Sequence, residues 1–172
     1  VSSISTTNAS SYSGGFVGYK YKYGNLTITD CIFSGKISST SSSTSSSATS
    51  CSGGFVGRSS GNPTIIGCIS SGKISSTSSS TSYSGGFVGT AKNGKVESCV
   101  FSGAIKEGKT QGAIVASGSL TVIDTYYLEG SCSSAGGGVM KTAEEMASDE
   151  FLAILNQDTV LFEKDIEPMV NN

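Results

Sequence analysis

The amino-acid sequence predicts an all-β protein, a parallel β-helix (β-solenoid) of about four three-stranded coils with a short C-terminal helical cap. Three observations lead to this prediction. The string SGGFVG occurs at residues 13–18, 52–57 and 84–89. A second string follows each copy at a similar distance and reads DCIFSGKISST, GCISSGKISST and SCVFSGAIK. A third β-prone stretch lies between the two, and linked motifs that recur in phase indicate one structural unit used repeatedly.

Each repeat contains three short β-prone stretches, separated by Gly, Asn or Ser as turns require. The first is GGFVG, and a decayed fourth copy reads QGAIVA at 111–116. The second stretch aligns one apolar column, Ile28, Ile65, Val96 and Val122, and the third aligns another, Ile37, Ile74 and Ile105. Strands in such columns stack on their equivalents in the next coil at about 4.8 Å. Four coils make a short rod, and the chain begins at Val1 without Met, so we expect a segment of a longer array.

Two Ser/Thr-rich tracts connect the third strand to the next SGGFVG copy, and we expect them to form loops at 38–50 and 75–82. Loop-closure entropy rises slowly with length, so such tracts tolerate insertion. Two readings stay open, a solvated surface insertion and a glycosylated or partner-contacting loop. The candidate glycosylated residues are Ser41, Thr44, Ser45, Ser78 and Thr81.

The repeat period stops near Val139. Thr142 and Glu145 form a T-x-x-E capping box, and Ser148 precedes a second segment, DEFLAILN, with one apolar face. A solenoid needs a lid over its last coil, and we expect this helix to supply it. The chain therefore divides into a β-helix domain at 1–138 and a helical cap and tail at 139–172.

Three of the five cysteines, Cys31, Cys68 and Cys99, occupy one column of the repeat, with Thr125 in the fourth unit. We expect an inward-facing ladder of small apolar thiols, with a disulfide between adjacent coils as the alternative. Cys51 takes the place of Tyr12 and Tyr83 before SGGFVG, which suggests a surface edge. It pairs with Cys132 only if loops bring the two together.

The composition argues against several functions. A formal net charge of −2 does not supply the basic field of a nucleic-acid-binding protein, and no apolar run is long enough to cross a membrane. The chain has no His, and Asp30 and Asp124 would stand about 14 Å apart, too far for a glycosidase pair. We expect no enzymatic activity, no metal site and no cofactor.

Tyrosines concentrate beside the first strand of the repeat, and they are candidates for contact with a glycan or a protein partner. The alternative is packing against a preceding coil. These residues are Tyr12, Tyr19, Tyr21, Tyr23 and Tyr83.

The thrice-repeated G-F-V-G within SGGFVG, followed by the C-x-x-S-G-x-I strand, resembles the GLUG motif. The resemblance spans roughly residues 10–156, with Phe in place of the usual Leu. It implies repeats of large bacterial cell-surface or secreted proteins, including haemagglutinin-like adhesins and immunoglobulin A peptidases. It implies no peptidase activity here, because the sequence has no H-E-x-x-H.

These observations predict a non-catalytic, adhesin-like or structural display segment of a larger extracellular or cell-surface protein. Its expected partners are a glycan or host-surface protein and neighbouring domains, without nucleic acid or membrane insertion. The alternative is an accessory β-helix segment of a secreted peptidase or glycan-active enzyme. A third class, an ice- or surface-binding solenoid, is suggested by Thr27 and Thr29, but Ile66 and Glu97 interrupt that column.

Overall fold

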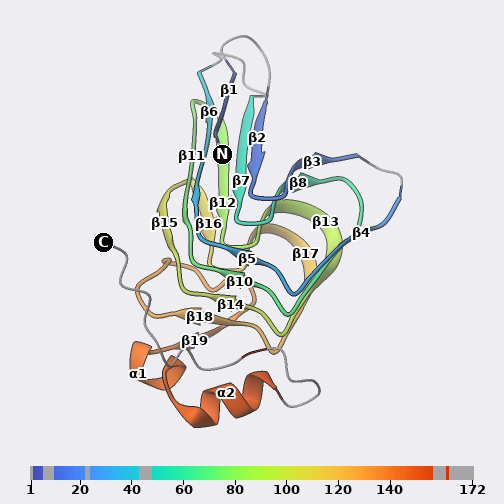
Figure 1. Cartoon of the computed structure of the whole chain (residues 1–172). Helices are drawn as coiled ribbons and strands as arrows, with labels where there is room; N and C mark the ends of the chain where they lie inside the picture. Colours follow the sequence, from blue (N-terminus) through green and yellow to red (C-terminus); the bar gives the residue numbers. More distant parts are fainter. Residues whose placement is uncertain (1, 6–9, 22–23, 43–47, 157–161, 163–172) are drawn as a thin grey trace.

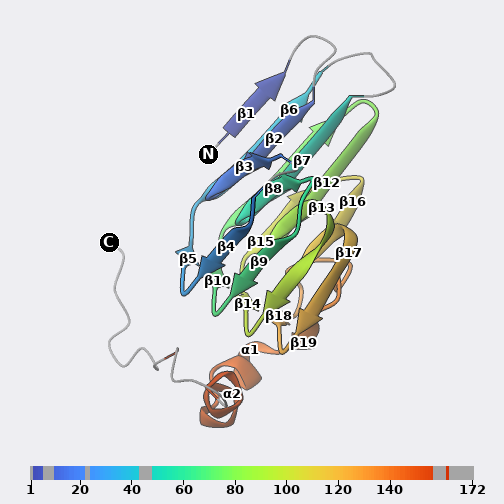
Figure 2. The same cartoon turned by 90° about the vertical axis from the view of Figure 1, so that its right-hand side faces the viewer.

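The computed structural model describes residues 2–5, 10–21, 24–42, 48–156 and 162. It is a stack of coils whose equivalent strands pair in parallel, so that four sheets run along the stack. Figure 1 looks along the stack, and Figure 2 shows the coils side by side. The predicted parallel β-helix with C-terminal helices is confirmed.

The four sheets are named A to D. Sheet A contains β1 (Ser2–Ser5), β6 (Lys36–Ser41), β11 (Lys73–Ser78) and β15 (Ala104–Glu107). Sheet B contains β2 (Ser11–Gly14), β7 (Thr49–Gly53), β12 (Thr81–Gly85) and β16 (Thr110–Gly112). Sheet C contains β3 (Val17–Lys20), β4 (Leu26–Thr29), β8 (Val56–Ser59), β9 (Pro63–Ile66), β13 (Val88–Glu97) and β17 (Val115–Ile123). Sheet D contains β5 (Ile32–Phe33), β10 (Ile69–Ser70), β14 (Val100–Phe101), β18 (Tyr126–Leu128) and β19 (Val139–Lys141).

The predicted columns are in register. In sheet C, Ile28 pairs with Ile65, Ile65 with Val96, and Val96 with Val122. In sheet A, Ile37, Ile74 and Ile105 are aligned in the same way. Two of the three predicted stretches are divided, because the chain bends at Gly15–Phe16 and again after Phe33.

The first bend brings the phenylalanines of SGGFVG into one core ladder. Phe16 stacks on Phe55 with ring centroids 4.9 Å apart, and Phe55 stacks on Phe87 at 5.2 Å. Phe55 and Phe87 are fully buried. Ile114 takes the equivalent position in the fourth coil, where it accepts a backbone hydrogen bond from Phe87. The ladder explains why each copy has a large apolar residue at this position.

The structure contradicts the predicted Ser/Thr-rich loops for residues 38–41, 49–50, 75–78 and 81–82, which lie in strands. Residues 36–41 and 73–78 are strands of sheet A, and residues 49–53 and 81–85 are strands of sheet B. Sheets A and B face each other in the arm at the top of Figure 1. Beyond Ile37 and Ile74, every second residue of these strands and of β2 is a buried serine on the facing side: Ser11, Ser13, Ser39, Ser41, Ser50, Ser52, Ser76, Ser78, Ser82 and Ser84. Residues 43–47 lie outside the described residues.

We call these buried serines the serine core. Their hydroxyls form hydrogen bonds with one another and with backbone carbonyls, which offsets the cost of removing them from water. Ser39 Oγ lies 2.8 Å from both Ser50 Oγ and Ser52 Oγ. The serine that opens each SGGFVG copy donates to a carbonyl of sheet A: Ser13 to Ser38, Ser52 to Ser75, and Ser84 to Glu107. This repeated bond ties the two sheets together in three successive coils.

Substituting Ser84 by Ala should lower the free energy of unfolding by about 1–3 kcal/mol. The change leaves the Glu107 carbonyl and the Ser76 hydroxyl without their bonds to Ser84 Oγ, at 2.5 and 2.8 Å. Urea denaturation measures the effect. The control is Ser71→Ala, an exposed serine, for which less than about 0.5 kcal/mol is expected. Equal losses in the two variants would show that the serine core contributes nothing specific.

Segment 129–138 covers the last coil. Ala113 N donates to Ser134 O at 2.8 Å, and Ile114 N donates to Ala135 O at 3.3 Å. A side chain at Gly136 or Gly138 would meet Val115 or Ile114 of that coil. The lid that was expected from the helix is therefore supplied by this Gly/Ser-rich segment.

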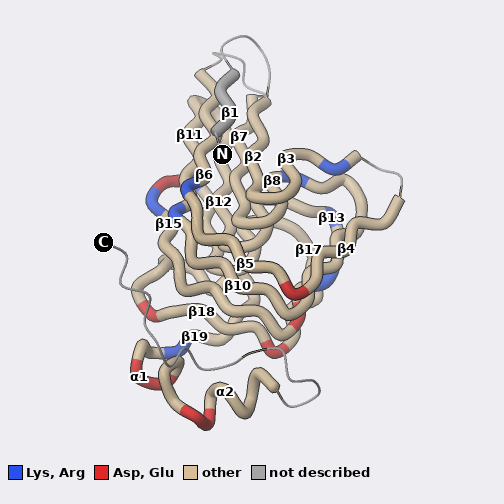
Figure 3. Tube along the Cα trace, in the orientation of Figure 1, with Lys and Arg blue, Asp and Glu red and all other residues tan. Residues whose placement is uncertain are grey.

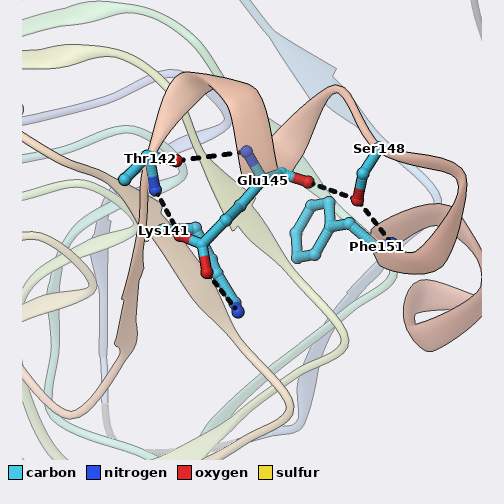
Figure 4. Close-up of polar contacts among 5 residues, drawn as sticks. All are labelled: Lys141, Thr142, Glu145, Ser148 and Phe151. Carbon is cyan, nitrogen blue, oxygen red and sulfur yellow. Dashed lines mark hydrogen bonds and ion pairs between the residues drawn. The ribbon is translucent and has the colours of Figure 1, made fainter.

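The predicted helices are α1 (Ala143–Met146) and α2 (Asp149–Leu155). The capping box is present, since Glu145 N donates to Thr142 Oγ1 at 3.1 Å and Thr142 N donates to Glu145 Oε2 at 2.8 Å (Figure 4). Ser148 caps α2 by accepting from Phe151 N at 3.1 Å. Phe151 is buried against Tyr126, edge to face at 5.0 Å, so α2 packs on the outside of sheet D and not across the end of the stack. In the described part of the chain, neither helix is long and apolar enough to cross a bilayer.

Candidate functional site

The bend at Gly15–Phe16 creates an inside corner between the outer faces of sheets B and C. The outer column of sheet B is Tyr12, Cys51, Tyr83 and Thr110. The outer column of sheet C is Tyr19, Arg58, Thr90 and Ser117. The two columns contact each other within the first coil and between neighbouring coils, as in Arg58 with Tyr12 and Cys51 with Thr90, and we call this surface the BC corner. Glycine is required at the bend, because a Cβ at Gly14, Gly53 or Gly85 would collide with a backbone carbonyl of the same coil.

In the first coil the corner is aromatic. Tyr12 and Tyr19 stack with centroids 5.2 Å apart, and Tyr21 meets Tyr19 edge to face at 6.2 Å. Tyr19 and Tyr21 are 44% and 66% exposed, so both remain open to a partner. Tyr83 lies two coils from Tyr12 and is half-buried, and Tyr23 lies outside the described residues. The structure thus brings together three of the five predicted tyrosines.

In the second coil the corner holds Arg58, which sequence reasoning did not select. Arg58 Nη1 donates to the Tyr12 hydroxyl at 2.8 Å, and its guanidinium carbon lies 5.3 Å from the centre of that ring. The position aligns with Tyr19 and Thr90, so the repeat alignment alone marks it only as variable. Its role follows from the bend, which places it against a tyrosine 46 residues earlier in the chain.

A hollow of about 310 Å³ lies beside Arg58 on sheet C. Arg58 and Lys92 supply positive charge to its lining, and Ser60, Thr90 and Ser117 supply hydroxyls. Tyr19 borders it, with its hydroxyl 3.1 Å from Ser60 Oγ. Figure 3 shows the basic segments of β3, β8 and β13 on this side of the molecule. The corner can therefore bind an anion and offer an aromatic face together.

Cys51 lies in the corner and not at a surface edge as predicted. It is fully buried between the tyrosine positions of the neighbouring coils, with Sγ 3.7 Å from Thr90 Oγ1. Cys132 Sγ instead approaches Gln111 Oε1 at 3.8 Å, and all five cysteines are free. The disulfide alternatives are therefore absent from this structure.

Burial should protect Cys51 from alkylation. Desolvation raises the pKa of its thiol to about 11, although the Thr90 hydrogen bond and the Arg58 charge act in the opposite direction. The thiolate, which is the reactive form, is therefore scarce at pH 8. Iodoacetamide followed by mass spectrometry should label partly exposed Cys132 well before Cys51, and urea should remove the difference. Equal labelling rates in the folded chain would contradict the burial of Cys51.

The cysteine column does point inward, with Cys68 and Cys99 fully buried and Cys31 half-buried in the first coil. Each thiol approaches the carbonyl two residues earlier, at 3.0 Å for Cys31, 3.1 Å for Cys68 and 3.0 Å for Cys99. Thr125 makes the equivalent bond at 2.7 Å. The column therefore requires a small side chain that can donate a hydrogen bond, and not only a small apolar one. Thr125 in the fourth unit was the feature of the sequence that pointed to this requirement.

The residues before this column form a left-handed corner. Asp30, Ser98 and Asp124 have φ of 53°, 50° and 43°, and Gly67 has φ of 63°. Short polar residues and Gly tolerate this conformation. The two aspartates are therefore explained as turn residues of the first and fourth coils.

The candidate glycosylated residues are mostly enclosed. Ser41 and Ser78 are 2% and 7% exposed and belong to the serine core, so their hydroxyls are not offered at the surface. Thr81 is half-buried at the start of β12, and Thr44 and Ser45 lie outside the described residues. Glycosylation of this region stays a prediction, as does the division of the chain into two domains.

One comparison with known proteins identifies the repeat. Residues 48–75, which comprise most of the second coil, match the family model described as the GLUG motif. The resemblance predicted from G-F-V-G is thus confirmed for this unit. Comparisons with curated proteins and with solved structures give no significant match.

Proposed function

We propose that this chain, whose residues 48–75 carry a GLUG motif, is a non-catalytic adhesion and display segment of a larger extracellular protein. The motif supports a repeat region of the kind found in bacterial surface proteins. The structure supports a scaffold, because the repeated strings account for packing, turns and hydrogen bonds between coils.

The observation that carries the proposal is the parallel pairing of equivalent strands from coil to coil, which continues on both sides of the register shifts at Ile74/Ser75 and Ala91/Asn93. Sheet C pairs continuously from β4 through β9 and β13 to β17, and sheet A pairs from β1 to β15. Outward-facing residues of successive coils therefore stand in lines about 4.8 Å apart. Extended solenoid faces of this kind suit long or repetitive partners.

Adhesion of beads coated with the purified chain to cultured epithelial cells would test the proposal. We expect saturable adhesion that the soluble chain competes away, and no turnover in parallel incubations with polysaccharides and peptide libraries. Absence of saturable adhesion would contradict the adhesive role. Turnover that a single substitution in the chain abolishes would contradict the non-catalytic role.

A further inference from the structure

We infer that the BC corner binds a carboxylated sugar, with Arg58 holding the carboxylate and the exposed tyrosines contacting the ring. The inference rests on the proposed function, because it names a ligand class for an adhesive surface. It depends on the juxtaposition of an aromatic pair in the first coil with a cationic hollow that spans the second to fourth coils.

The charge of the hollow favours an anion. Its lining includes Arg58 and Lys92, and none of its lining residues in the described part of the chain is acidic. The ion pairs found among the described residues, Lys95–Glu97 and Lys141–Glu145, involve neither of these cations. The chain as a whole carries a formal net charge of −2, so this local excess of positive charge runs against the average.

The guanidinium of Arg58 is preorganised to bind a carboxylate. Its bond to the Tyr12 hydroxyl and its position over the Tyr12 ring fix the guanidinium, while one Nη1 bond uses only part of its donor set. The planar fork of Arg matches the two oxygens of a carboxylate. A guanidinium already fixed in place loses less conformational entropy when the ligand binds.

The surroundings fit a sugar ring better than a small inorganic anion. Ser60, Thr90 and Ser117 offer hydroxyls that can donate to and accept from sugar hydroxyls. Tyr19 contacts Ser60 of the lining through its hydroxyl, and Tyr21 packs edge to face on Tyr19. Both rings are exposed, and such rings combine an apolar face with a polar hydroxyl. A volume of about 310 Å³ is enough for a small ligand.

Titration calorimetry with trigalacturonate tests the inference on the full chain, with the fully methyl-esterified trisaccharide as the matched uncharged ligand. We expect the acid to bind at least about tenfold more tightly than the ester, since hydrogen bonds to a charged group are stronger than those to a neutral one. Arg58→Gln should weaken binding of the acid by at least about tenfold, and Arg58→Lys should have an intermediate effect because it keeps the charge and loses the fork. Lys95→Gln, on the same sheet but outside the hollow, should bind as the native chain does.

Arg58 also contacts Tyr12, so its substitution could disturb the aromatic pair. Lys92→Gln is therefore a second variant, which removes a positive charge from the hollow and leaves the Arg58–Tyr12 contact in place. Thermal unfolding checks that each variant is folded. Equal binding of acid and ester, no binding of either, or native affinity in both Arg58→Gln and Lys92→Gln would overturn the inference. Competition by inorganic phosphate at the same concentration as trigalacturonate would also overturn it, since the site would then be a simple anion site. If the Arg58→Gln variant no longer bound trigalacturonate but beads coated with it still adhered to cells, this inference would be contradicted. The proposed adhesive function would not be contradicted by that result.

Discussion

Replacing Gly86 by Ala is expected to destabilise the folded chain by at least about 3 kcal/mol, or to prevent folding. A Cβ at this position would overlap the carbonyl oxygen of Ala113 on the next coil and lie 2.7 Å from Cγ of the Phe101 ring. The carbonyl belongs to a backbone that cannot withdraw, because the flanking Gly112 and Ile114 carbonyls accept hydrogen bonds from Gly86 and Phe87. Relief would require the two coils to separate. Thermal unfolding should show a fall in Tm of roughly 10 °C.

Gly24→Ala is the matched control for this substitution. Its φ is 82°, and no heavy atom lies within 4 Å of the added Cβ, so only the conformational preference of glycine is lost. That loss is about 1–2 kcal/mol. If Gly86→Ala destabilised the chain no more than Gly24→Ala, close approach of the coils would not be the reason for glycine in SGGFVG.

The natural sequence already contains a related substitution. Gly15, Gly54 and Gly86 each face the equivalent carbonyl on the next coil, whereas the fourth copy has Ala113. Above Ala113 lies segment 129–138, whose Ser134 carbonyl accepts from Ala113 N, in place of another SGGFVG copy. The loss of glycine in the last coil is what close coil-to-coil packing predicts. The role of these glycines as packing residues could therefore be inferred from the repeat alone.

The serine core could not be inferred in the same way. A composition of Ser and Thr usually indicates solvated loops, and that reading was wrong for residues 38–41 and 75–78. The relevant signal is the period of two in those tracts, which continues the inward face of Ile37 and Ile74 through Ser39 and Ser76. These serines can be buried because hydroxyls and carbonyls of the opposite sheet form hydrogen bonds with them. That sheets A and B pack face to face is a property of the tertiary structure, and the sequence of one strand does not reveal it.

Only the tyrosines of the BC corner could be predicted from the sequence. The tyrosines are conspicuous, but Arg58 acquires its meaning from Tyr12, which reaches it through the bend at Gly15–Phe16 and the stacking of two coils. A linear alignment shows which residues share a column. It does not show which two columns face each other, and that relation creates the candidate site.

Phe87→Ala is expected to lower the free energy of unfolding by about 3–5 kcal/mol. Phe87 is fully buried and stacks on Phe55 at 5.2 Å. Its removal leaves a cavity between Phe55 and the fourth coil, and the surrounding strands cannot close it because each is fixed in register to its neighbours. Urea denaturation monitored by circular dichroism measures the change.

Phe16 provides a control from the same column. It has the same ring and a similar stack on Phe55, at 4.9 Å, but it is 49% exposed in the first coil. Because about half of its surface already meets solvent, Phe16→Ala should cost only about 1–1.5 kcal/mol. A solenoid core stabilised by stacking predicts this gradient along one column of identical residues, with the larger loss at Phe87. Equal losses at Phe16 and Phe87 would mean that another coil covers Phe16 in solution, or that the ladder does not stabilise the stack.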